Sequence, residues 1–295
     1  MASDAHAHPS DLLERYPEAE QERRRLGVSC AASAWNPSEF EAQERLALEA
    51  GRDGAAPLAL CFAVHPQLPA ARSKGEAAPL YETAELLGTL ETLAAENRLS
   101  AVGETGFDLY SKAYRDTEKE QEELFRRHLD VAFKRGLPVV LHIRRAMHKA
   151  FSYTKELKSL PAVVFHSYSG TLAEGQSLLG RGINAYFSFG AAILLNHRAA
   201  MDSCARLPTE RLLTETDAPY QPLRLRPFSS WADLPAIIAG AAALRREAGS
   251  PAGDSAELEA AVDRNFRQVY GEGPGALRRQ ARGRCGGVPR RGGRA

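Results

Sequence analysis

The sequence predicts a (β/α)8 barrel, and three observations support this fold class. Short apolar runs recur eight times along the chain, and a helical pattern follows nearly every one. Several runs end in a histidine or an acid and then a loop, as in 136–144, where Gly-Leu-Pro-Val-Val-Leu-His-Ile-Arg delivers His142. The length of 295 residues suits one α/β barrel. Because the carboxyl ends of barrel strands meet at one face, the same pattern predicts an active site there.

The expected strands are aliphatic or β-branched runs bounded by Gly, Pro or charged residues. The first carries His6 and His8 and is the weakest signal, because few residues precede the histidines. The others are 26–33, 57–66, 100–108, 136–144, 161–170, 184–190 and 212–219. Right-handed crossovers between successive strands make a parallel barrel the simplest topology.

The expected helices are charged, Leu- and Ala-rich stretches with apolar residues at helical spacing. They are 37–50, 80–97, 117–135, 146–157, 172–180, 193–206, 234–247 and 256–270, with 14–25 either a helix or an exposed connection and 71–78 a loop. One barrel domain is therefore expected over 1–277. The arginine-rich segment 278–295 is expected to be a disordered tail, because it has too little apolar content to fold.

Composition excludes several classes of protein. The hydrophobic fraction of 44% and the charged fraction of 25% are those of an ordinary globular protein. No apolar run has membrane-spanning length and the N-terminus lacks a signal-peptide pattern, so a cytoplasmic location is expected. Four scattered cysteines form no Cys-x-x-Cys pair, which indicates reduced thiols rather than a zinc ribbon or a disulfide framework.

The charge is unevenly distributed along the chain. Seven arginines and no acid lie in 278–295, which leaves 31 basic and 37 acidic residues before it, a net charge of −6. Net charge alone would therefore not attract a polyanion to the barrel. If nucleic acid is the substrate, metal ions and local arginines must hold it.

Six side chains are expected to meet at the barrel mouth as metal ligands: His6, His8, Glu104, His142, His166 and Asp217. Four imidazoles and two carboxylates can hold two divalent ions if one carboxylate bridges them, and Glu104 is the natural bridge. Such ions can activate a water as the nucleophile, with Asp217 as general base. Glu104 and Asp217 are therefore the expected catalytic residues. Whether the ions are Mg, Mn or Zn stays open.

Other residues have weaker claims on the site. Arg144 could bind a phosphate oxygen, or it could be a surface or salt-bridging arginine. His65, at the end of the third strand, could contact substrate, although a structural hydrogen-bonding role is about as common. His128, His148 and His197 fall within helical segments, where a structural role is expected.

The ordered motifs resemble those of the TatD-type metal-dependent hydrolases. They are Asp4-x-His6-x-His8, Gly103-Glu104-x-Gly106-x-Asp108, His142-x-Arg144-x-Ala146, Phe165-His166-x-x-Ser169-Gly170 and Glu215-Thr216-Asp217-x-Pro219, and the resemblance covers about 4–271. It implies a barrel of the amidohydrolase type and phosphodiester hydrolysis, most simply by a DNase of the 3′–5′ exonuclease kind. DNA is the implied substrate, and the resemblance implies neither membrane association nor an obligate protein partner.

The chain departs from that family pattern at several positions, none of them an expected metal ligand. Pro9 follows His8, Gln67 stands where a second histidine is common, Arg145 replaces a common acid, and Ser167 and Tyr168 replace a Cys-Phe pair. Two other functions stay open. One is a two-metal hydrolase of an amide, lactone or other ester, since fold and ligands do not fix the substrate. The other is a non-catalytic protein that retains metal and binds a partner.

Overall fold

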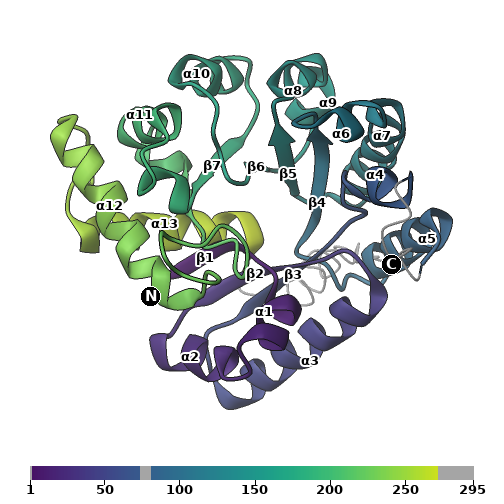
Figure 1. The fold of residues 1–295 in the computed structure, drawn as a ribbon, viewed down its shortest axis with the longest axis horizontal. Helices are drawn as coiled ribbons and strands as arrows, with labels where there is room; N and C mark the ends of the chain where they lie inside the picture. Colours follow the sequence, from purple (N-terminus) through teal and green to yellow (C-terminus); the bar gives the residue numbers. More distant parts are fainter. Residues whose placement is uncertain (1, 74–80, 272–295) are drawn as a thin grey trace, which may run out of the picture.

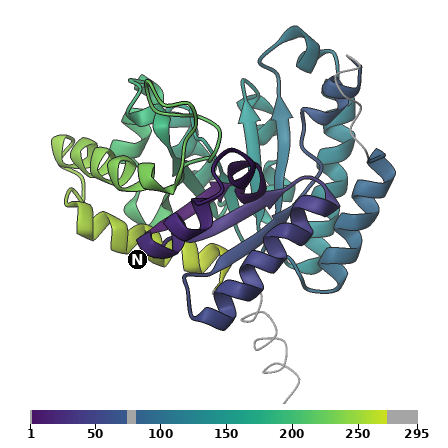
Figure 2. The same cartoon turned by 60° about the horizontal axis from the view of Figure 1, so that its bottom comes forward.

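Eight parallel strands form the centre of the molecule and helices surround them, as Figure 1 and, from another direction, Figure 2 show. The computed structural model describes residues 2–73 and 81–271. Neighbouring strands pair in chain order, which confirms the predicted (β/α)8 topology. The strands are β1 Ser3–Ala7, β2 Ser29–Ala34, β3 Leu58–Phe62, β4 Ala101–Asp108, β5 Val139–Arg144, β6 Val163–Phe165, β7 Ala185–Phe189 and β8 Leu212–Thr214.

The seam between β8 and β1 is closed by hydrogen bonds that lie just beyond β8. The backbone N–H of Thr216 and its hydroxyl donate to the carboxylate of Asp4, at 3.0 and 2.6 Å. Asp217 donates its N–H to the carbonyl of His6 (3.0 Å), and His8 donates to the carbonyl of Ala218 (2.7 Å). These bonds fix the loop after β8 against the end of β1, where two of the predicted ligands lie.

Helices follow the strands, and several of them are shorter than the sequence predicts. They are α1 Pro9–Arg15, α2 Ala19–Leu26, α3 Pro37–Asp53, α4 Leu68–Ser73, α5 Thr83–Ala95, α6 Lys112–Arg115, α7 Glu118–Arg135, α8 Met147–Ser152, α9 Thr154–Lys158, α10 Leu172–Gly180, α11 Arg198–Arg206, α12 Leu234–Glu247 and α13 Ser255–Tyr270, with 3-10 turns η1 Ala191–Ile193, η2 Thr209–Arg211 and η3 Trp231–Asp233. No helix within the described ranges is long and apolar enough to cross a membrane.

Three predicted elements are wrong in detail. The expected helix 146–157 is two helices that meet at Tyr153, whose buried ring packs on Phe107 and Phe125. The expected helix 193–206 begins at Arg198, because Asn196 is left-handed (φ 62°) and breaks the helical path. The expected loop 71–78 is helical up to Ser73, and its remaining residues lie outside the described ranges.

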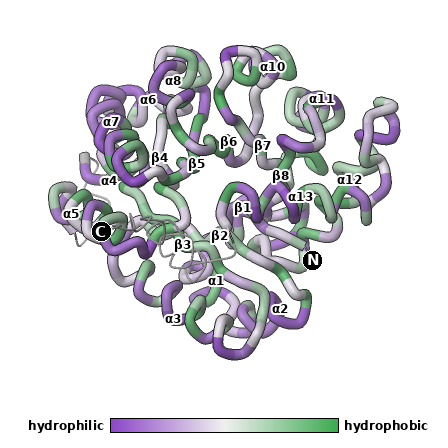
Figure 3. The backbone as a smooth tube through the Cα atoms, turned by 180° about the vertical axis from the view of Figure 1, so that it is seen from behind, coloured by the Kyte–Doolittle hydropathy of each residue, from purple (hydrophilic) through white to green (hydrophobic). Residues whose placement is uncertain are grey.

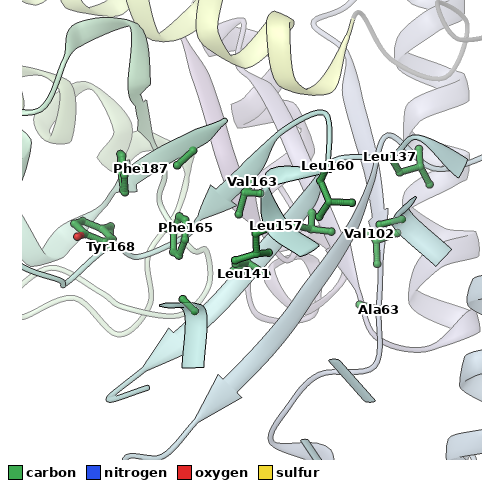
Figure 4. Packing of buried hydrophobic residues seen from close by; sticks show 14 of the residues in the cluster. Ala63, Val102, Leu137, Leu141, Leu157, Leu160, Val163, Phe165, Tyr168 and Phe187 are labelled. Atoms are coloured by element: carbon green, nitrogen blue, oxygen red, sulfur yellow. The ribbon is translucent and has the colours of Figure 1, made fainter. Parts of the chain in front are cut away.

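The core has two layers that follow from the alternation of side chains along each strand. In β3, the side chains of Leu58, Leu60 and Phe62 pack outward against the helices, while Ala59 and Cys61 point into the barrel. Figure 4 shows part of the outer layer, and Figure 3 shows the hydrophilic residues on the surrounding helices.

Helix α13 closes the bottom of the barrel. Phe266, Val269 and Tyr270 of this helix cluster with the small side chains of the barrel interior, and the Tyr270 hydroxyl donates to the carbonyl of Ala5 at 2.9 Å.

The expectation of reduced thiols is confirmed for Cys30, Cys61 and Cys204, which are buried and free. The fourth cysteine and the tail 278–295 lie outside the described residues, so the predicted domain boundary at 277 stays a prediction.

Candidate active site

The structure brings the six predicted side chains together at the carboxyl ends of the strands. His6, Glu104 and His142 lie on β1, β4 and β5, and His8 directly follows β1. His166 and Asp217 follow β6 and β8, which end earlier than the sequence suggests; beyond these strands, Ser167 and Asp217 have positive φ angles of 45° and 53°. Three overlapping sets of ligand atoms lie within 4.8 Å of one another: His6, Glu104 and His166; His6, His8 and Asp217; and His65, Glu104 and His142.

The carboxylate of Glu104 stands between two groups of histidines. Its Oε2 lies 3.2 Å from Nε2 of His6 and 3.8 Å from Nε2 of His8. Its Oε1 lies 2.5 Å from Nδ1 of His142 and 2.6 Å from Nε2 of His166. Each oxygen therefore faces a different group of imidazoles, which is the arrangement that a bridging ligand requires.

The geometry of His6, His8 and Asp217 fits a cation. The two Nε2 atoms lie 3.2 Å apart, and Oδ1 of Asp217 lies 3.7 and 3.6 Å from them. Two nitrogens that bind one zinc ion tetrahedrally, each about 2.1 Å from it, would be about 3.4 Å apart. Two imidazole nitrogens and a carboxylate oxygen that converge on one point form a donor set for a divalent cation.

The two carboxylates are ionised at neutral pH. Burial raises the pKa of Glu104, but the surrounding histidines outweigh it and hold the pKa well below its usual value. Burial likewise raises the pKa of Asp217, but the hydrogen bond and charge of His8 and the charge of His6 outweigh burial and lower this pKa. Burial lowers the pKa of His8, but the hydrogen bond and charge of Asp217 raise it to about 9. Without a metal, the site thus pairs ionised carboxylates with protonated imidazole, and a bound cation would take the place of those protons.

Residues other than the predicted ligands position the ligand set. The hydroxyl of Ser33 lies 3.3 Å from Nδ1 of His6, and Oδ2 of Asp108 lies 3.2 Å from Nε2 of His142. Gln221 donates from its amide to Oδ2 of Asp217 at 2.5 Å. Such outer contacts orient metal-binding side chains. Ser33 and Asp108 are far in the sequence from the histidines they contact, and Gln221 reaches Asp217 across a tight loop. The spacing of residues along the sequence therefore did not predict these contacts.

Asp4 and Glu215 belong to the sequence motifs, but they support the site and are not among the predicted metal ligands. Asp4 is fully buried in the β1–β8 seam, and burial raises its pKa to about 7. Glu215 accepts from the N–H and the hydroxyl of Ser167, both at 2.7 Å, and lies 3.5 Å from Nδ1 of His166. Both carboxylates therefore hold the loops that carry the predicted ligands.

The structure places His65 in the cluster itself. Its Nε2 lies 3.5 Å from Oε1 of Glu104, and its Nδ1 accepts the N–H of Gln67. His128 is buried and packs as expected, accepting the N–H of Val64 at 2.8 Å, so it ties α7 to the end of β3. His148 is exposed on α8, and His197 caps α11 by accepting the N–H of Ala200.

Arg144 lies outside the six-residue cluster. Its guanidinium is 3.9 Å from Asp108, 4.0 Å from the ring centre of Tyr110, and about half exposed. It lines the same cavity as Glu104 and Asp217, which has a volume of about 970 Å³. A cavity of this size holds a ligand as large as a nucleotide. The arginine thus lies along the wall of the cavity, beside the cluster.

A parallel eight-stranded barrel with convergent histidines and carboxylates at its carboxyl-terminal mouth defines a metal-dependent hydrolase. The sequence profile described as TatD related DNase matches residues 3–271. The chain belongs to this family, as the resemblance of its motifs predicted.

Curated relatives support that assignment. The chain is 33% identical to the 3′-5′ ssDNA/RNA exonuclease TatD of Klebsiella pneumoniae (strain 342) over 187 residues, which is 61% of this chain and 68% of that protein. It is 34% identical to the exonuclease of the same name from Escherichia coli (strain K12) over 189 residues, again 61% of this chain and 68% of the relative.

Solved structures agree on the fold. The crystal structure of YJJV, a TatD homolog from Escherichia coli K12, superposes with a TM-score of 0.73 at 24% identity and covers 91% of this chain and 97% of its own. A TatD family hydrolase from Entamoeba histolytica gives a TM-score of 0.70 at 17% identity, with the same coverage of 91% and 97%. At these identities the likeness concerns the barrel itself.

Proposed function

We propose that this protein is a divalent-metal-dependent phosphodiesterase that degrades single-stranded DNA from the 3′ end. The observation that carries the proposal is the Glu104 carboxylate, whose two oxygens face two separate groups of histidines. The names of the curated relatives supply the substrate class and the polarity. The cavity beside the cluster has room for a terminal nucleotide.

Two divalent ions would be held by the six predicted residues. His6, His8 and Asp217 would hold one ion and His142 and His166 the other, with Glu104 between them, as the distances favour. When bound, such a pair lowers the pKa of a shared water and neutralises charge on a phosphate. Imidazole-rich sites suit Zn or Mn, whereas many nucleases use Mg, so the identity of the ions is a matter for measurement.

Asp217 would act as the general base. Its Oδ1 faces the cluster and the cavity, while its Oδ2 is occupied by the amide of Gln221. The protein therefore holds Oδ2 in place, while Oδ1 would bind the first ion and also accept the proton of the attacking water. The depressed pKa of Asp217 keeps the carboxylate unprotonated before that step.

Nucleotide release from a 5′-labelled single-stranded oligonucleotide tests the proposal. Metal-loaded wild type should shorten the DNA stepwise from its 3′ end with Mg²⁺, Mn²⁺ or Zn²⁺, and Glu104→Gln should lower the rate by more than about 100-fold. Glu123→Gln, an exposed position on α7, is the matched control and should behave as wild type.

Two outcomes would contradict this assignment. Wild-type protein that retains its ions but releases no nucleotide is not a nuclease, and activity on lactones, amides or simple esters under the same conditions would favour the alternative hydrolase. Activity of any kind that survives both Glu104→Gln and Asp217→Ala would show that the two carboxylates have no part in catalysis.

The cytoplasmic location also stays a prediction, which imaging of a fluorescent fusion would test.

A further inference from the structure

Two neighbouring arginines share one aromatic ring at the wall of the cavity. The guanidinium carbons of Arg144 and Arg145 lie 4.0 and 4.6 Å from the ring centre of Tyr110. All three side chains line the cavity that contains Glu104. Guanidinium groups within about 6 Å of a ring centre are attracted by its π-electrons, so the tyrosine holds both positive charges in place.

The loop that carries Tyr110 is itself fixed. The N–H of Tyr110 donates to Oδ1 of Asp108 at 2.9 Å, and Arg115 donates to the carbonyls of Leu109 and Tyr110 at 3.2 and 3.1 Å. The N–H of Leu109 donates to the carbonyl of Arg144 at 2.9 Å, which joins this loop to the end of β5. The ring and the two arginines therefore form one ordered unit.

The charge of this unit is incompletely balanced. Asp108 lies 3.9 Å from Arg144 but also contacts His142 and Gln67. Among the described residues, no carboxylate lies within ion-pair distance of Arg145. Both arginines are exposed, and like charges held beside one ring favour an anion between or next to them.

We infer that Arg144, Arg145 and Tyr110 bind a second phosphate of the nucleic-acid strand, adjacent to the phosphate that is cleaved. Arg144 lies two residues beyond His142 on β5, about 6.6 Å along the strand. That offset resembles the step between neighbouring phosphates in an extended single strand. The inference rests on the proposed function and adds a subsite that selects oligonucleotides over substrates with one phosphate.

Each residue has a distinct part in this subsite. The two guanidinium groups supply planar N–H donors to the phosphate oxygens. Tyr110 is a positioning residue, because it keeps both groups oriented and so reduces the entropy lost when the phosphate binds. The ring, and not the hydroxyl, does this, so Tyr110→Phe should retain the subsite and Tyr110→Leu should not.

The test compares two substrates with each variant. On a single-stranded oligonucleotide, Arg145→Gln and Tyr110→Leu should raise KM by roughly three- to tenfold. On bis(4-nitrophenyl) phosphate, which has one phosphate, neither should change kcat or KM. Binding of a fluorescein-labelled oligothymidylate in EDTA, followed by anisotropy, should show that Arg145→Gln flattens the dependence of log Kd on log salt by about 0.7.

The matched control is Arg206→Gln, which removes an equally charged, exposed arginine at the end of α11. An Arg145→Gln variant that is indistinguishable from Arg206→Gln in oligonucleotide KM and salt dependence would overturn the subsite. So would equal losses on both substrates. If the wild type hydrolyses neither substrate, the proposed function fails, and the anisotropy titration alone then decides whether the subsite binds the strand.

Discussion

The two carboxylates at the centre of the site differ in what their oxygens contact. Both oxygens of Glu104 face imidazole nitrogens, whereas Oδ2 of Asp217 accepts a hydrogen bond from Gln221 and Oδ1 faces His6 and His8. Gln221 also donates to the hydroxyl of Ser167 at 2.6 Å, so its amide is held in place. This difference suits Glu104 for bridging and Asp217 for proton transfer.

We expect Gln221→Leu to lower kcat on DNA by about tenfold, in the range seen when outer contacts of metal sites are removed. Leucine has a similar size but cannot donate to Asp217, which would then be free to rotate. Steady-state kinetics of the metal-loaded protein measure this. Gln176→Leu, at an exposed position on α10, is the control. Equal kcat values for the two variants would show that Asp217 is oriented without Gln221.

At the residue scale, the sequence predicted side chains that follow an apolar strand and missed those that act through a distant partner. His142, His166 and Asp217 could be found because each lies near or just beyond the carboxyl end of a strand. Gln221 and Ser33 could not, because Gln221 reaches Asp217 across the loop after β8 and Ser33 contacts His6 between neighbouring strands. The doublet Arg144-Arg145 was visible, but its contact with Tyr110 was not.

Strands β4 and β5 approach each other closely where they carry Glu104 and His142. Gly106 pairs with His142 in the ladder and has a φ of 138°, which L side chains rarely adopt. A Cβ at this position would collide with the carbonyl oxygen of His142. Glycine is therefore required here for the strands to place the two ligands side by side.

Gly106→Ala should destabilise the protein by roughly 2–4 kcal/mol, because it adds both a clash and backbone strain. Thermal unfolding should shift down by roughly 5–15 °C. Gly88→Ala on α5, where an added Cβ meets open space, should be neutral or slightly stabilising. A melting temperature for Gly106→Ala within about 2 °C of wild type would mean that β4 and β5 can separate at little cost.

Helix α7 is joined to the end of β3 by His128, which accepts the N–H of Val64 and donates to the carbonyl of Leu124. Burial lowers the pKa of His128 to about 4. The folded protein thus keeps this imidazole neutral at a pH where the unfolded chain, with a pKa near 6.5, already binds a proton. The resulting stability is present above pH 6.5 and is lost as the pH falls towards 4.

The contribution of His128 to this pH dependence is up to roughly 3 kcal/mol between pH 6.5 and 4. His128→Gln should therefore have a smaller loss of unfolding free energy over this range, measured by urea denaturation of metal-free protein. His148→Gln, at an exposed position, should retain the slope of wild type. If His128→Gln loses as much unfolding free energy between pH 6.5 and 4 as the wild type does, His128 is not the source of this pH dependence.

At the element scale, the order and type of the elements could be predicted, but their ends could not. The helical pattern runs through Tyr153 and Asn196, where backbone geometry and packing break the helices. Strands β6 and β8 stop early, and the chain turns beyond them at Ser167 and Asp217, whose positive φ angles the local composition does not predict. These breaks still leave each ligand at the barrel mouth, so the site prediction did not depend on them.

The molecule as a whole is a barrel whose last seam is closed at the site. Hydrogen bonds from the loop of Thr216 and Asp217 to β1 bring His6 and Asp217, 211 positions apart in the chain, to within 3.7 Å. Barrel topology follows from eight strand signals, but this closure depends on buried Asp4, for which the sequence suggested no role. Loss of the seam would separate the ligands of the first proposed ion.

Anomalous diffraction from crystals of the Mn²⁺-loaded protein tests the central claim most directly. We expect two manganese peaks in each chain, one beside His6, His8 and Asp217 and the other beside His142 and His166, with one oxygen of Glu104 directed at each. Glu104→Gln crystals should lose at least one peak. A single ion, or ions bound away from these side chains, would contradict the account.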